Sequence, residues 1–127
     1  MIFAAYQLRL GRRIAVLQAL QEFFKTISER ERAFASASEG DRENAFVDFL
    51  NALELYAAAY IKRLITGVSR ELVRDKLIDS LALIENAPHW HEKIEEAVTS
   101  EPTFKYLKAF LTKYRSIVSA RQAARRS

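Results

Sequence analysis

Large hydrophobic residues recur every three or four positions along the first quarter of the chain, from Phe3 to Phe34. They fill eight of the ten a and d positions of one heptad frame, and Arg13 and Glu31 fill the other two. The eight are Phe3, Tyr6, Leu10, Leu17, Leu20, Phe24, Ile27 and Phe34. This spacing predicts one long amphipathic helix. At 1.5 Å per residue it would span about 48 Å, so we expect it to bend, to break near Gly11 or to project toward a partner.

A second helix is predicted over about residues 43–65, after a loop at residues 36–42 (SASEGDR). Its broad apolar face contains Phe46, Phe49, Leu53, Tyr56, Tyr60 and Leu64. Gly67 is suited to end this helix in the left-handed conformation, and Ser69 is suited to cap the next one. Val68 and Val73 would then pack together as a hydrophobic staple around that cap.

Three further helices follow, and the first of them is expected over about residues 70–86. Pro88 suits the first turn of a short helix to about residue 99, and Pro102 introduces a last helix over about residues 103–124. Short connections favour antiparallel neighbours. The expected fold class is therefore all-α, a single-domain helical bundle of about five helices with a long N-terminal helix. Residues 1–120 would form the bundle, and residues 121–127 a basic C-terminal tail.

Composition supports a compact helical chain. The 127 residues fit one domain, half of them are hydrophobic, and only three are Gly and two Pro. Cysteine is absent, which excludes disulfide scaffolds, zinc ribbons and thiol nucleophiles. The apolar start (MIFAAYQL) precedes the first arginines and is far shorter than the roughly 20 residues of a membrane span. We therefore expect a soluble, cytoplasmic protein with no membrane span.

The net charge of +4 is unevenly distributed. Residues 1–21 contain three Arg and no acid, and residues 102–127 contain seven Lys or Arg and no acid. Between them, ten bases against sixteen acids leave residues 22–101 at −6. The basic ends either pack against this acidic middle, which we favour, or attract an anionic partner. The candidate contacts to an anion or nucleic acid are Arg9, Arg12, Arg13, Lys105, Lys108, Arg115, Arg121, Arg125 and Arg126.

The stretch APHWHEKIEEAV holds both histidines and the only tryptophan. On a helix, His89 and His91 project about 200° apart, so they do not ligate one metal from one face. Zinc sites on helices place histidines at i and i+4, as in H-E-x-x-H, and this stretch lacks that spacing. We therefore expect Trp90 and Ile94 to dock a short helix, with solvated histidines beside an acidic surface. That surface would contain Glu92, Glu95 and Glu96.

One other carboxylate lies at the border of an apolar face. Glu54, beside Asn51, is either a base with a raised pKa or, as we favour, a polar contact that fixes the helix register. No phosphate loop, G-x-S-x-G elbow or EF-hand loop is present. The sequence thus proposes no catalytic residue, cofactor or metal site, and we expect a protein that is not an enzyme.

Three segments carry a resemblance to a known family. They are FLNALELYAAA, which contains an F-x-N-x-x-E core, GVSRELVRDKL and PTFKYLKAFLTKYR. Between Phe46 and Arg115, a little over half the chain, their order resembles an uncharacterised family of small bacterial and phage helical proteins. Members of that family often carry a transmembrane helix ahead of this region, and nothing before Gly11 is long enough to be one. The resemblance implies no activity and no site residues.

The function expected from the sequence is protein–protein interaction. The long first helix would associate with itself or with a partner protein, through exposed residues such as Phe3, Tyr6 and Leu10. A narrower hypothesis is inhibition of a host defence complex by occluding its nucleic-acid-binding surface. The alternative is nucleic-acid binding without sequence specificity, if the two basic ends converge in the fold.

Overall fold

The computed structural model describes residues 2–86, 88–100 and 102–126, and leaves aside the side chains at 2, 3, 6, 88, 91, 100 and 126. Five α-helices form this part of the chain, and the expected all-α bundle with a long N-terminal helix is confirmed. The helices are α1 (Ile2–Ser36), α2 (Arg42–Ile61), α3 (Gly67–Glu85), α4 (Pro88–Ser100) and α5 (Lys105–Arg126). A single 3-10 turn, Pro102–Phe104, precedes α5.

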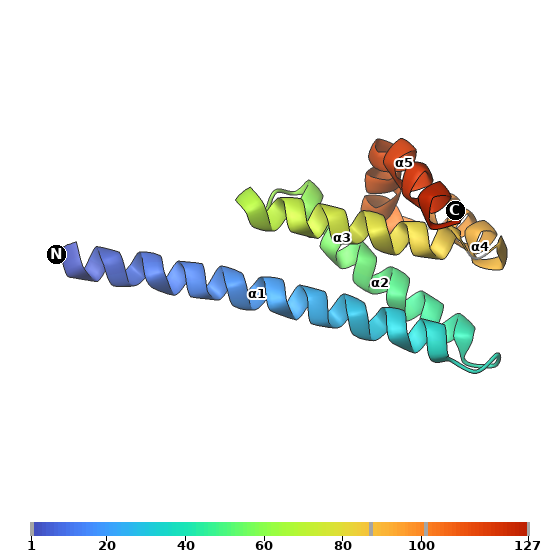
Figure 1. Cartoon of the computed structure of the whole chain (residues 1–127), viewed down its shortest axis with the longest axis horizontal. Coiled ribbons are helices and arrows are strands. Elements are labelled where there is room, and N and C mark those ends of the chain that lie inside the picture. Colours follow the sequence, from blue (N-terminus) through green and yellow to red (C-terminus); the bar gives the residue numbers. More distant parts are fainter. Residues whose placement is uncertain (1, 87, 101, 127) are drawn as a thin grey trace.

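Helix α1 runs for 35 residues without interruption and passes straight through Gly11. At 1.5 Å per residue it is about 52 Å long, and its N-terminal half extends well beyond the other four helices (Figure 1). Only its C-terminal half packs on α2 and α3, through the buried side chains of Phe23, Ile27 and Phe34. Of the alternatives open for this helix, the structure therefore selects projection rather than a break at Gly11.

The core lies where α2 and α3 pack against α1, α4 and α5. Helix α2 contributes six buried residues, which occur at the spacing expected of one helical face: Phe46, Phe49, Leu50, Leu53, Ala57 and Tyr60. Aromatic rings join this face to its neighbours, with Phe34 of α1 and Trp90 of α4 both against Phe46. The sixth residue of the predicted face, Leu64, lies beyond the end of α2 and is 76% exposed.

The connection between α2 and α3 differs from the prediction. The left-handed residue that ends α2 is Arg63, at φ 59°, rather than Gly67, which also has a positive φ but begins α3. The Arg63 N–H bonds to the Tyr60 carbonyl and the Leu64 N–H bonds to the Ala59 carbonyl. This pair of bonds is the Schellman pattern, and it closes the helix four residues before the predicted end.

The predicted cap of α3 is also wrong. Thr66, not Ser69, is the residue before the helix, and its side chain makes no capping hydrogen bond. Val68 is 71% exposed while Val73 is buried, so the two do not form the expected staple.

The two prolines mark helix starts as predicted, at Pro88 for α4 and at the 3-10 turn before α5. Helix α5 contains a kink at Tyr114, whose backbone (φ −110°, ψ 16°) departs from helical values. It then continues past Ala120 to Arg126, and Arg121 bonds to Asp79 of α3. The sequence predicted a basic tail that begins at residue 121. In the structure Arg121 is part of α5 and bonds to α3, so the predicted boundary at residue 120 does not separate it from the bundle.

Candidate functional site

The projecting half of α1 carries a row of exposed apolar side chains. Every described side chain from Ala4 to Ala19 is exposed, including Leu10 at 46% and Leu17 at 57%. Leu8, Ile14 and Val16 are exposed to a similar degree. The side chains of Phe3 and Tyr6, which were predicted to share this surface, lie outside the described residues. We call Leu10, Ile14 and Leu17 the N-terminal stripe.

The N-terminal stripe continues the seam that α1 uses inside the bundle. In the same heptad frame Leu10 and Leu17 lead to Phe24 and Ile27, which are half-buried and buried. A heptad seam drifts by about 20° per repeat around a straight α-helix. Over the two repeats from Leu10 to Phe24 the seam shifts by about 40° around α1, toward the side that contacts α2 and α3. One heptad seam, apolar except at Arg13 and Glu31, is covered along its second half and exposed along its first.

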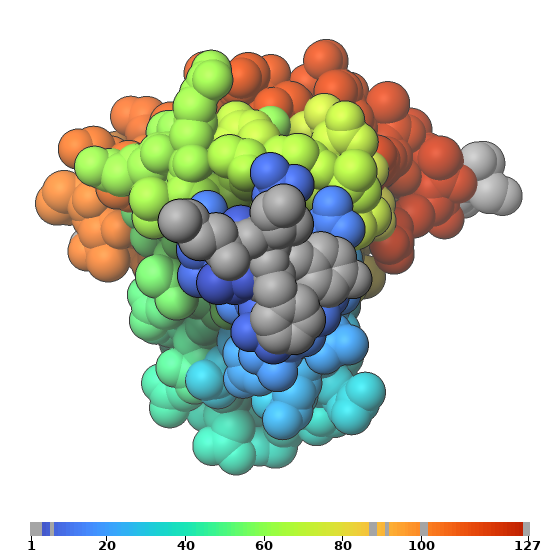
Figure 2. Space-filling model, turned by 90° about the vertical axis from the view of Figure 1, so that its left-hand side faces the viewer, coloured from blue at the N-terminus to red at the C-terminus, as the bar shows by residue number. Residues whose placement is uncertain are grey.

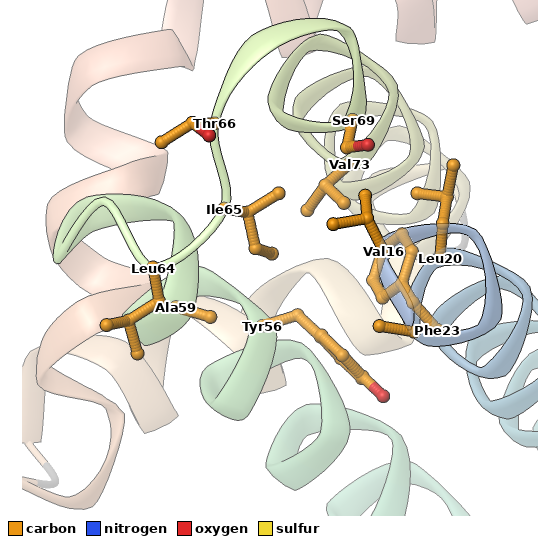
Figure 3. A pocket seen from close by; sticks show the side chains of 11 residues that line it. Val16, Leu20, Phe23, Tyr56, Ala59, Leu64, Ile65, Thr66, Ser69 and Val73 are labelled. Atoms are coloured by element: carbon orange, nitrogen blue, oxygen red, sulfur yellow. The ribbon is translucent and has the colours of Figure 1, made fainter. Parts of the chain in front are cut away.

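An apolar groove of about 300 Å³ lies where the projecting half of α1 leaves the bundle. Val16 and Leu20 of α1 face Ile65 and Val73 across it, with Tyr56 of α2 at its base (Figure 3). Viewed from the N-terminal side, the blue end of α1 lies nearest the viewer, below the yellow-green start of α3 (Figure 2). The groove thus extends the apolar surface of α1 toward the α2–α3 connection.

Two of the predicted anion contacts form ion pairs with acids of the same chain. Arg115 of α5 donates to Glu85 of α3, at 3.0 Å, and to Glu95 of α4. The Glu85 side chain is only 1% exposed, and the hydrogen bond with Glu95 raises the pKa of Arg115. Arg121 donates to Asp79 at 2.8 Å. Arg115 and Arg121, both candidate anion contacts, are thus paired with acids of the middle region, which is the arrangement that the charge distribution favoured.

The remaining predicted cations do not form one surface. Arg9, Arg12 and Arg13 are exposed on the projecting half of α1, while Lys105, Lys108 and Arg125 are exposed on α5. The side chain of Arg126 is outside the described part. The two ends of the chain lie at opposite ends of the molecule's long axis (Figure 1). The basic ends therefore do not converge, and the condition on which the nucleic-acid alternative depends is not met.

Trp90 docks α4 onto the bundle, as predicted. It is 8% exposed, and its ring meets Phe34 edge-on with the centroids 5.1 Å apart. His89 is exposed beside it, and the side chain of His91 is outside the described residues. Within the described chain, no group of three or more His, Cys, Asp or Glu residues is placed to hold a metal ion. The predicted acidic surface is only partly present, because Glu95 pairs with Arg115.

Glu54 caps the last helix. Its Oε1 accepts the Tyr106 N–H at 2.9 Å and its Oε2 accepts the Leu107 N–H at 2.6 Å. These N–H groups belong to the first turn of α5, where backbone donors have no partner within their own helix. Both carboxylate oxygens are engaged by α5, and Asn51, the neighbour named in the sequence analysis, is exposed. The carboxylate fixes the position of α5 rather than the register of α2.

The fold and these surfaces define a small all-α bundle with one projecting amphipathic helix. None of the helices, over the residues described, combines the length and the apolar character needed to cross a membrane. Comparison with protein-family models, with curated proteins and with solved structures finds no match to this chain. The resemblance between Phe46 and Arg115 to a family of small bacterial and phage proteins therefore stays a prediction.

Proposed function

We propose that this protein functions through protein–protein association, and that a second copy of the chain covers the N-terminal stripe of α1. The observation that carries this proposal is the continuous seam, whose second half packs inside the bundle while Leu10 and Leu17 are exposed. Large apolar side chains gathered on a helix that projects from its domain are typical of an interaction surface.

A second copy supplies a helix with the same heptad spacing, which is what the stripe requires. Two α1 helices packed side by side bury the stripe of each against the other in a two-fold symmetric pair. Heptad seams pack by knobs-into-holes contacts between such helices. The chain therefore carries both halves of the proposed interface.

The antiparallel orientation is favoured by charge and by shape. In a parallel pair, the two Arg13 side chains would meet in one layer of the seam. In an antiparallel pair each Arg13 packs beside an apolar residue, over which its aliphatic stem can lie. The bundles then stand at opposite ends of the paired helices, because each α1 projects from its own bundle (Figure 1).

Sedimentation equilibrium of the whole chain tests the association. The wild type is expected to dimerise, and the double variant Leu10→Glu/Leu17→Glu to remain monomeric with unchanged helicity, since both side chains are already exposed. Leu55→Glu is the matched control, because Leu55 is 64% exposed on α2 and lies outside the stripe. A monomeric wild type would overturn the proposal, and so would a double variant that dimerises as the wild type does.

One engineered cysteine tests the orientation, since the chain has none of its own. A spin label on Gln7→Cys, near the N-terminal end of α1, should give a longer distance between the two labels in an antiparallel dimer than in a parallel one. A short distance would identify a parallel pair and contradict the proposed arrangement. A label on Gly11→Cys, close to the centre of the overlap, provides the short-distance comparison.

A further inference from the structure

A second pocket, of about 220 Å³, lies on the molecule where the end of α2, the start of α3 and the middle of α5 meet. Its lining includes three cations and two tyrosines: Arg63, Arg70, Lys113, Tyr60 and Tyr114. No carboxylate is among the lining residues. We call it the basic pocket. Sequence analysis did not single out any of its three cations, because they come from three separate segments.

Arg70 is held in place by Tyr60. Its guanidinium carbon lies 3.7 Å from the centroid of the Tyr60 ring, and one of its nitrogens donates to the Tyr60 carbonyl at the end of α2. A guanidinium has five N–H donors, so this contact leaves others for a ligand. Among the described residues no carboxylate pairs with Arg70, and Arg74 on the next turn of α3 already has Asp75 as its partner.

Arg63 reaches the basic pocket from the backbone turn that ends α2. It adopts the left-handed conformation, at φ 59°, which L-residues other than Asn and Asp seldom adopt. The side chain is exposed and no carboxylate in the described chain pairs with it. The kink at Tyr114 adds a second local distortion at the same pocket. Such distortions concentrate at ligand sites.

The two tyrosines supply a hydroxyl donor. The Tyr60 and Tyr114 hydroxyls are hydrogen-bonded to each other. Because only one of them donates in that bond, the other O–H is free to bond to a ligand. Burial, followed by the hydrogen bond with Tyr114, raises the pKa of Tyr60, so its hydroxyl keeps its proton at neutral pH.

We propose that the basic pocket binds a phosphate group, either free phosphate or the phosphomonoester of a small molecule. Three cations from three separate segments line the pocket without a carboxylate, and this charge suits a phosphate dianion better than a carboxylate, which carries one charge and offers two oxygens. Guanidinium groups are well matched to phosphate oxygens. The volume is below the roughly 300–1,000 Å³ of sites that enclose a drug-sized ligand, so the pocket fits the phosphate group and leaves the rest of an ester outside. This proposal is independent of the association through α1.

Titration of the whole chain with inorganic phosphate, followed by NMR, tests the proposal. Saturable shifts at the amides of Arg63, Arg70 and Lys113 are expected, and they should weaken as salt is raised. The double variant Arg63→Gly/Lys113→Gln should bind at least about tenfold more weakly, because two charge-assisted contacts are lost. Glycine also suits the left-handed turn, so this variant should fold. Lys108→Gln, an exposed lysine of α5 outside the pocket, is the matched control.

A parallel titration with glycerol phosphate distinguishes the two sources. Tighter binding of the ester than of inorganic phosphate identifies a phosphomonoester as the ligand class, and equal or weaker binding identifies free phosphate. The absence of saturable shifts at low salt with either probe would overturn the proposal. Equal affinities for the wild type and the double variant would overturn it as well.

Discussion

Glu54 connects two helices that are far apart in the sequence. Its carboxylate accepts the N–H groups of Tyr106 and Leu107, which lie 52 and 53 residues further along the chain. A negative charge at the N-terminal end of a helix also interacts favourably with the helix dipole. Glu54, a residue of α2, therefore caps the N-terminal end of α5 from outside that helix.

The substitution Glu54→Gln should lower the free energy of unfolding by about 1–2 kcal/mol, as expected for the loss of charge-assisted hydrogen bonds at a helix terminus. A glutamine amide keeps a single acceptor oxygen, so one of the two N–H groups loses its partner. Urea unfolding followed by circular dichroism measures the change. Glu29→Gln, on the exposed surface of α1, should change stability by less than about 0.5 kcal/mol. Equal effects of the two substitutions would contradict the capping role.

Because of the hydrogen-bonded pair Tyr60 and Tyr114, we expect the free energy of unfolding to fall at alkaline pH. Since burial and the bond to Tyr114 raise the pKa of Tyr60, the folded chain holds this proton more tightly than the unfolded chain does. The resulting stabilisation is complete below the ordinary tyrosine pKa of about 10. It is lost as the pH rises through the higher pKa of the folded state.

Urea unfolding on either side of about pH 10 measures this dependence. The free energy of unfolding should fall more steeply in the wild type than in Tyr60→Phe/Tyr114→Phe, which lacks both titrating hydroxyls. The double substitution leaves every other ionisable side chain in place, so the difference between the two slopes isolates the pair. Parallel slopes would refute the assignment.

Residues whose role depends on a distant partner were the ones that sequence reasoning misjudged. Glu54 was correctly placed at the edge of an apolar face, but its partner is a backbone terminus 52 residues away. For Arg115 the sequence named no individual partner, because its acids, Glu85 and Glu95, lie 30 and 20 residues back. The charge distribution did favour packing of the basic ends against the acidic middle, and the ion pairs of Arg115 agree with that expectation.

At the scale of elements, local patterns predicted the existence of the helices well, but they misplaced the end of α2 and the start of α3. The heptad spacing located α1, and Pro88 and Pro102 located the start of α4 and of the turn before α5, because these signals act within a few residues. The end of α2 was misplaced, since Gly67 is the better left-handed residue by propensity. The structure uses Arg63 instead, where Arg70 binds the Tyr60 carbonyl that the terminating helix presents.

Helix α4 depends on Trp90 for its attachment. Trp90→Ala removes a ring that packs against Phe34 and Phe46, and it should destabilise the protein by about 3–5 kcal/mol. Thermal unfolding followed by circular dichroism measures the loss. The neighbouring substitution His89→Ala, at an exposed position, should stay within about 0.5 kcal/mol of the wild type. A larger effect of His89→Ala than of Trp90→Ala would contradict the docking role of the tryptophan.

At the scale of the whole molecule, α1 has two halves with different support. Phe23, Ile27 and Phe34 anchor the C-terminal half in the core, while the described side chains from Ala4 to Ala19 are exposed. In proteins, most of the stability of a helix comes from packing of an amphipathic face rather than from intrinsic propensity. The projecting half is therefore stabilised only by its continuity with the anchored half, unless a partner covers it.

Hydrogen exchange should reveal this difference along α1. In dilute protein, the amides of residues 7–15 should exchange much faster than those of residues 23–34, whose opening requires disruption of the core. Raising the protein concentration should slow exchange in residues 7–15 of the wild type if a second copy covers them. The Leu10→Glu/Leu17→Glu variant provides the comparison, because its exchange should not depend on concentration. Equal protection of both halves in the dilute wild type would contradict this account of α1.

The cap that Glu54 provides also bears on the order in which the chain is made. Domains synthesised on ribosomes can begin to fold from the N-terminal side, and Glu54 emerges about 50 residues before the helix that it caps. Until Tyr106 and Leu107 have been synthesised, the Glu54 carboxylate has no N–H groups of α5 to accept, and the α2 surface that packs on α5 is uncovered. The nascent chain thus exposes an incomplete core until α5 is made, and α5 completes that core by binding to a carboxylate made before it.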